Sequence, residues 1–177
     1  MIKSIGLLFL MFFLFQDPVL KKQKLTDYLT MDVSTDLQEM TQQELSSKFL
    51  GAKIPDVALT NSQSAVEFTI TASPTFWQKG DIALLKDFYD SSIPNLFEEI
   101  KFFQKELVTI NNKEFIAYQF DGKPETEGGR VAEQRYTYLL YTIHKNGLVT
   151  INFSCPPYLK SKWQPIAQEM FESTEFR

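Results

Sequence analysis

The chain has 177 residues, of which 44% are hydrophobic, 14% aromatic and 23% charged. That composition is typical of a folded globular chain and argues against intrinsic disorder. The formal net charge is −4 and the basic residues are scattered, which argues against nucleic-acid binding, because that affinity needs clustered positive charge. With a single cysteine, Cys155, the chain is not a disulfide scaffold.

The N-terminal segment has the pattern of a secretory signal. Lys3 precedes an unbroken apolar run over residues 5–15, and a helix that crosses a bilayer needs about twenty apolar residues. We therefore expect residues 1–15 to be a signal peptide, residues 16–24 a flexible mature N-terminus and residues 25–177 one domain. The predicted location is periplasmic or extracellular. The alternative is an uncleaved anchor, which would then be the chain's only membrane contact.

The first half of the domain mixes strand and helix patterns. Alternating Leu29, Met31 and Val33 predict a strand with one buried face. Thr41 and Glu44 have the spacing of a capping box, which predicts that a short helix begins there. Residues 57–59 and 66–70 then predict a hairpin.

A second helix is predicted from Asp81 as its cap until Pro94 stops it. Two further strands lie between residues 100 and 120, and Asn111-Asn112 is the turn between them. Residues 121–134 have no apolar period and predict a long loop.

The last third of the chain predicts a hairpin followed by a helix. Asn146-Gly147 indicates a tight turn between strands 136–145 and 148–155, with Cys155 on the core face. Apolar residues at helical spacing then predict a helix that covers the sheet, and Pro165 is expected near its first turn or at a kink. The stripe is Leu159, Trp163, Ile166, Ala167, Met170 and Phe171.

Little in the sequence supports catalysis. The one histidine, His144, precedes the predicted turn, where a partly exposed side chain without a special role is expected. One histidine and one cysteine do not make a usual zinc site, and no loop has the spaced acids of a calcium site. We therefore predict no catalytic residue, no metal and no cofactor.

Two sets of residues are candidates for partner binding. Phe76 and Trp77 lie in a loop, where large apolar side chains either plug the core or anchor a partner, and the core is the favoured interpretation. The second set flanks the predicted long loop and could line a groove, although tyrosines alternating along a strand are usually ordinary sheet residues. Its members are Arg135, Tyr136, Tyr138 and Tyr141.

From residue 25 to residue 176 the order of predicted elements resembles the PsbP-like family, which includes the Ran-binding Mog proteins and DcrB-type proteins. The resemblance lies in the order of the elements: the early strand, the capping-box helix, the strand pair that ends at residues 66–72, the helix over residues 81–92, the hairpins around residues 111–112 and over 136–155, and the final helix with its Lys162-Trp163-Gln164-Pro165 run. It implies an α+β fold in which an antiparallel sheet is flanked by helices as an α/β/α sandwich. It also implies a binding or accessory role, without residues that identify the partner. Some PsbP proteins hold metals with histidines and acidic residues, a set that this chain lacks.

These inferences give two hypotheses from different classes. The first is an exported, non-catalytic PsbP-like domain that binds a protein or another component of the envelope or the extracellular space. The alternative is a carrier of a small apolar ligand, held in a pocket between the sheet and the helices.

Overall fold

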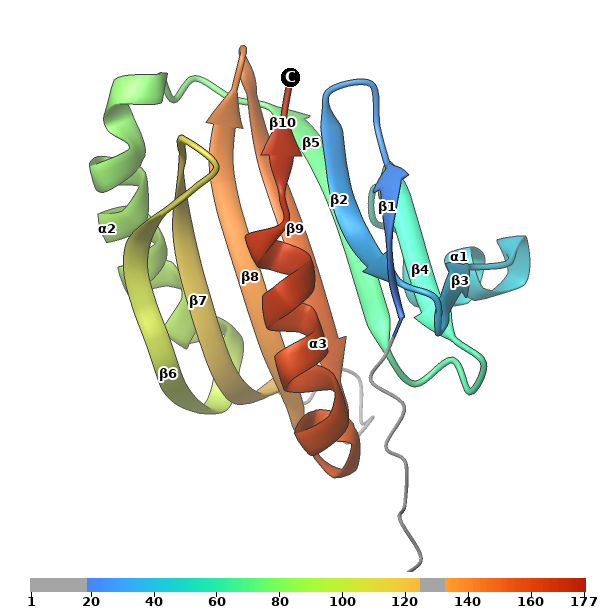
Figure 1. The fold of residues 1–177 in the computed structure, drawn as a ribbon. Helices are drawn as coiled ribbons and strands as arrows, with labels where there is room; N and C mark the ends of the chain where they lie inside the picture. Colours follow the sequence, from blue (N-terminus) through green and yellow to red (C-terminus); the bar gives the residue numbers. More distant parts are fainter. Residues whose placement is uncertain (1–18, 125–132) are drawn as a thin grey trace, which may run out of the picture.

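A computed structural model describes residues 19–124 and 133–177 of the chain. Across these residues ten strands form two antiparallel sheets, with three α-helices packed around them (Figure 1). The larger sheet has the strand order β3-β4-β5-β9-β8-β7-β6, and the smaller has the order β1-β2-β10.

The larger sheet is formed by β3 (Leu37–Glu39), β4 (Val57–Asn61), β5 (Glu67–Pro74), β6 (Phe97–Ile110), β7 (Lys113–Pro124), β8 (Arg135–His144) and β9 (Gly147–Cys155). The smaller sheet is formed by β1 (Leu20–Lys24), β2 (Leu29–Ser34) and β10 (Glu175–Phe176). The helices are α1 (Gln42–Lys48), α2 (Ile82–Ser92) and α3 (Lys160–Glu172), and a 3₁₀ turn, Ile93–Leu96, continues α2.

The larger sheet has a buried core on each face. Alternation along β7 divides its side chains between them: Phe115 and Ala117 join one core, and Ile116 and Tyr118 join the other. The first core contains β2 and the apolar stripe of α3, and the second contains α2. Figure 1 shows α3 and α2 on opposite sides of the sheet. The predicted α/β/α arrangement is confirmed, with the small sheet lying beside α3 as an added part of that layer.

Local patterns placed several elements correctly. Thr41 caps α1, and its hydroxyl accepts a hydrogen bond from the Glu44 N–H while the Glu44 carboxylate accepts one from the Thr41 N–H. Asn111 and Asn112 have φ values of 48° and 64°, the left-handed conformation that a two-residue hairpin turn requires. Trp163, Ile166 and Phe171 of α3 are buried as expected.

The turn between β8 and β9 lies one residue earlier than predicted. Lys145 and Asn146 form it, and Gly147 already pairs with His144. Lys145, not glycine, takes the left-handed conformation, with φ at 55°. The strand pairing through Tyr136 and Cys155 sets this register. When the turn moves by one residue, the cross-strand partner of each residue moves by two positions. The side chains therefore keep the same face, and the predicted core face of both strands is correct.

Two segments expected to be irregular are strands. Leu20–Lys24, expected in a flexible N-terminus, is β1 and pairs with β2. Asp121–Pro124, expected in the long loop, continues β7 and pairs with β6. In both cases the segment is a strand because it forms hydrogen bonds with a neighbouring strand, and the local sequence does not indicate this pairing. The predicted signal segment and residues 125–132 of the predicted loop lie outside the described residues.

Candidate functional site

An aromatic patch covers the start of α2, and we call Phe76, Trp77, Leu84 and Phe88 the α2 patch. Phe76 is 80% exposed, Leu84 61% and Phe88 54%, whereas Trp77 is half-buried. The Phe76 and Trp77 rings lie 4.9 Å apart between centroids, and the Trp77 and Phe88 rings lie 6.4 Å apart. The favoured interpretation of Phe76 as a core plug is therefore wrong, and Trp77 lies between core and surface.

Local hydrogen bonds hold the loop that carries the patch. The Trp77 N–H donates to the Thr75 hydroxyl at 3.2 Å, and the Gln78 N–H donates to the Asp81 carboxylate at 2.7 Å. Asp81 thus fixes the turn that enters α2, whereas the sequence predicted only a cap. A loop fixed in this way presents Phe76 without the entropy cost of ordering a flexible segment on binding.

The patch is connected to the sheet by stacked rings. The Phe88 and Tyr89 rings lie 5.4 Å apart, and Tyr89 stacks on Tyr141 of β8 at 4.2 Å. Tyr141 was a predicted partner-binding residue, and burial raises its pKa above the usual tyrosine range. Phe88 and Tyr89 were not among the predicted site residues, although Phe88 stands beside the apolar face of α2 in the sequence pattern.

The other three predicted binding residues have different positions. Tyr136 and Tyr138 lie in the core beneath α3, with 0% and 5% of their surfaces exposed, so they are not available to a partner. Neighbouring odd-numbered positions of β8 face the opposite side, which is why Arg135 and Tyr141 are separated from these tyrosines. The two-residue spacing of Tyr136 and Tyr138 therefore indicates that both side chains lie on the core face of β8.

His144 ends β8 and is partly exposed, as the sequence predicted, but it also packs against two aromatic rings. Its ring stacks on that of Tyr28 at 5.1 Å and lies 5.1 Å from the Phe176 ring, so it joins the end of β8 to the end of the small sheet where β2 begins and β10 ends. Its Nε2 atom is buried and has no hydrogen-bond partner among the described residues. Burial, with the nearby Lys113 and Lys145 charges, holds the pKa of His144 below 6.5.

His144→Ala should therefore destabilise the fold, by about 1–2 kcal/mol, because two aromatic contacts are lost. His144→Phe should retain the contacts, remove the unpartnered nitrogen and leave stability equal or higher. Since the folded state lowers the pKa, the unfolded state binds the proton more readily below pH 6.5. Stability should thus be full above pH 6.5 and fall as the pH is lowered towards the folded-state pKa.

Urea unfolding at several pH values between about 5 and 7.5 measures both effects. His144 is the single histidine, so the histidine-linked decline should be absent in His144→Phe. The stacking assignment is wrong if His144→Ala and His144→Phe have the same free energy of unfolding.

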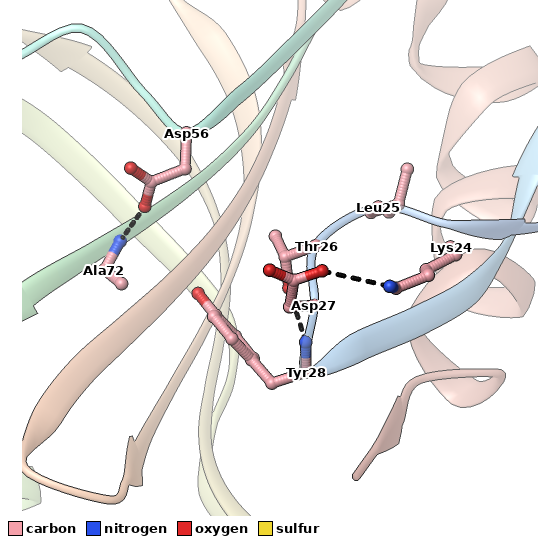
Figure 2. Close-up of a pocket in the computed structure, with 7 residues that line it drawn as sticks. All are labelled: Lys24, Leu25, Thr26, Asp27, Tyr28, Asp56 and Ala72. Carbon is pink, nitrogen blue, oxygen red and sulfur yellow. Dashed lines mark hydrogen bonds and ion pairs between the residues drawn. The ribbon is translucent and has the colours of Figure 1, made fainter.

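An open hollow of about 650 Å³ lies between the β1–β2 turn and β5 (Figure 2). Its charged groups are already engaged: Lys24 pairs with Asp27 at 3.0 Å, and Asp56 accepts a hydrogen bond from the Ala72 N–H at 2.6 Å. Tyr28 lines the hollow, but its hydroxyl oxygen is buried. We therefore do not assign a ligand to this hollow.

Cys155 is not placed as a reactive nucleophile, because its side chain is buried. Burial raises the pKa of the Cys155 thiol to about 11, which keeps it protonated and unreactive near neutral pH. Within residues 19–124 and 133–177 no group of three or more His, Cys, Asp or Glu side chains is placed to hold a metal ion. In the same part of the chain, no helix has both the length and the apolar character needed to cross a bilayer.

Comparison with known proteins shows the fold. No protein-family model and no curated protein sequence matches the chain. Among solved structures it is similar to cyanobacterial PsbP from Synechocystis, with a TM-score of 0.56, 11% identity, and coverage of 99% of this chain and 98% of that one.

Two other solved structures are similar at the same level. LpqN, which is involved in cell envelope biogenesis of Mycobacterium tuberculosis, matches with a TM-score of 0.58 and 11% identity over 84% of this chain and 82% of that one. The Ran-binding protein Mog1p of Saccharomyces cerevisiae matches with a TM-score of 0.56 and 13% identity, over 89% and 95%. The chain therefore has the PsbP-like fold, and identities this low show the fold alone.

Proposed function

We propose that the chain is an exported, non-catalytic PsbP-like domain that binds a protein partner in the cell envelope or outside the cell through the α2 patch. The observation that carries this proposal is the exposure of Phe76, Leu84 and Phe88, with the Trp77 ring close to both phenylalanine rings. Exposed apolar groups gathered in this way mark interaction sites, and clustered aromatic side chains are the usual anchors of protein interfaces.

The chemistry of α2 favours a protein over an anionic membrane as the partner. Membrane-surface helices carry clusters of Lys and Arg on their polar face. The single lysine of α2, Lys86, pairs with Asp90 at 2.6 Å, and Asp87 on the exposed face adds negative charge. A complementary protein surface would offer an apolar pocket for Phe76 and Phe88.

The sequence offers little material for a catalytic site, which supports a binding role. The one cysteine and the one histidine, which could have served as nucleophile and base, have structural positions. Cys155 lies in the core with a raised pKa, and His144 packs against the Tyr28 and Phe176 rings. The short apolar segment after Lys3 supports export. The likeness to LpqN, described as a cell envelope protein, is compatible with that location.

A photo-crosslinking amino acid placed at position 76 tests the α2 patch in the cell that makes the protein. Irradiation should give a discrete crosslinked product, identified by mass spectrometry. The same crosslinker at position 158 is the control, because Tyr158 is an exposed aromatic residue in the 3₁₀ turn Pro157–Leu159, which leads into α3 and not into α2.

Phe88→Ala in the crosslinking variant should reduce the product sharply, since loss of a hot-spot aromatic costs about 2 kcal/mol or more, or about 30-fold in affinity. The melting temperature should barely change, because exposed substitutions alter stability by about 0.5 kcal/mol or less. Identical products from positions 76 and 158, or none from position 76, would overturn the proposal.

A further inference from the structure

A second surface on the α2 side of the sheet has the form of a narrow groove. Its volume is about 270 Å³, and it lies where α2 ends in the 3₁₀ turn and the sheet continues uncovered. Its lining is mostly apolar, with Ile93, Leu96 and Phe97 on one side and Leu139 and Tyr141 on the floor. It also includes the polar side chains of Thr137, Asn152 and Ser154. Leu96 is 64% exposed, so the groove opens to solvent.

The groove follows strand β8. Arg135 and Tyr141 both line it, and the six residue steps of strand from one to the other correspond to about 20 Å. A volume of about 270 Å³ spread along that length is narrow. It suits one extended chain better than a ring system, and it is smaller than the usual 300–1,000 Å³ of a site for a drug-sized ligand.

Arg135 gives this groove a fixed positive end. Its Nε–H donates to the Ser154 hydroxyl at 3.1 Å, and Nη2 donates to the carbonyl oxygens of Ala65 and Ser154 at 2.9 and 3.2 Å. These bonds use three of the five N–H donors of the guanidinium group and hold the group in place. In residues 19–124 and 133–177, no carboxylate oxygen lies within 4.0 Å of Arg135.

A half-buried guanidinium with two remaining donors on Nη1 is complementary to a carboxylate, which it can bind with charge-assisted hydrogen bonds. We propose that the groove binds a single-chain carboxylic acid of fatty-acid type, with the carboxylate at Arg135 and the hydrocarbon chain along Leu139 towards Tyr141. The site is separate from the α2 patch. It gives the domain a small-molecule binding function in addition to the proposed protein partner.

Octanoate is the probe, and octanamide is the uncharged control with the same chain. Titration of the whole protein, followed by methyl resonances of Leu139 and Ile93 in NMR spectra, should give saturable shifts with octanoate. Octanamide should bind at least about tenfold more weakly, because the charged hydrogen bonds to Arg135 are absent.

Three variants separate the site from general effects on the fold. Thr137→Trp places a large ring on the groove floor and should abolish octanoate binding. Thr71→Trp, on the same sheet face but two strands away on β5, should retain it. Arg135→Met should weaken octanoate binding at least about tenfold and leave octanamide binding unchanged.

The proposal is overturned if octanoate gives no saturable shift at these methyl groups, or if octanamide binds as well as octanoate. It is also overturned if Thr137→Trp binds octanoate like the unmodified protein. Phe76→Ala should leave octanoate binding unchanged, so failure of this proposal and failure of the α2 patch proposal are distinguishable.

Discussion

Trp163→Ala is expected to lower the free energy of unfolding by about 3–5 kcal/mol, the largest effect of any substitution considered for this chain. Trp163 is 1% exposed, and its ring lies 5.9 Å from that of Phe153 on β9. Removing the indole leaves a cavity between α3 and the sheet, and neighbouring side chains of a packed core fill such a cavity only in part. The melting temperature should fall by roughly 6–20 °C.

Trp77→Ala is the matched comparison, because the chain contains two tryptophans in different settings. Trp77 is half-buried against the second core, so its loss should cost clearly less than that of Trp163. Urea unfolding monitored by circular dichroism measures both variants. Equal losses of stability would contradict the assignment of Trp163 to the core and Trp77 to the boundary of the α2 patch.

Cys155 is expected to resist thiol reagents in the native protein and to react once urea unfolds it. The residue has 0% exposure, and its raised pKa of about 11 leaves almost no thiolate at neutral pH. Labelling should therefore require opening of the β8–β9 region. Rapid labelling of native protein, measured by mass spectrometry over time, would contradict core placement.

Substitutions at Cys155 separate the loss of volume from the burial of a polar group. Cys155→Ser should destabilise by about 1–3 kcal/mol, since it buries a hydroxyl without a partner. Cys155→Ala should cost about 1 kcal/mol, because it removes little more than the volume of one methylene-sized group. If the serine variant is as stable as the alanine variant, a hydrogen-bond partner for the hydroxyl exists at this position.

The sequence predicted those parts of the fold that local chemistry decides. Thr41 and Glu44 sit three positions apart, and Asn111-Asn112 tolerates positive φ, so each feature identifies its structure without distant contacts. The α3 stripe was equally clear, because one face of a helix carries all its apolar residues. The PsbP-like order of elements followed from these local features.

Features that depend on distant residues were missed. The strand β1 is rich in lysine and is ordered by its pairing with β2. His144 packs against Tyr28 and Phe176, which are far from it in sequence. Lys145 accepts positive φ because the neighbouring strands fix the register. Sequence alone likewise could not tell whether Phe76 would be covered, since nothing local to a loop specifies what packs over it.

The small sheet has a consequence for the timing of folding. Of the described elements, β1 and β2 are synthesised first and β10 last, and the small sheet joins them. Lys22 of β1 forms a 2.8 Å ion pair with Glu175 of β10. Leu29 and Met31 of β2 are covered only when α3 and β10 are in place. Synthesis proceeds from the N-terminus at a limited rate, so the first core stays open until residues 160–176 have been made. Export through a translocation pore requires an unfolded chain. Late closure of the first core would keep the chain able to pass.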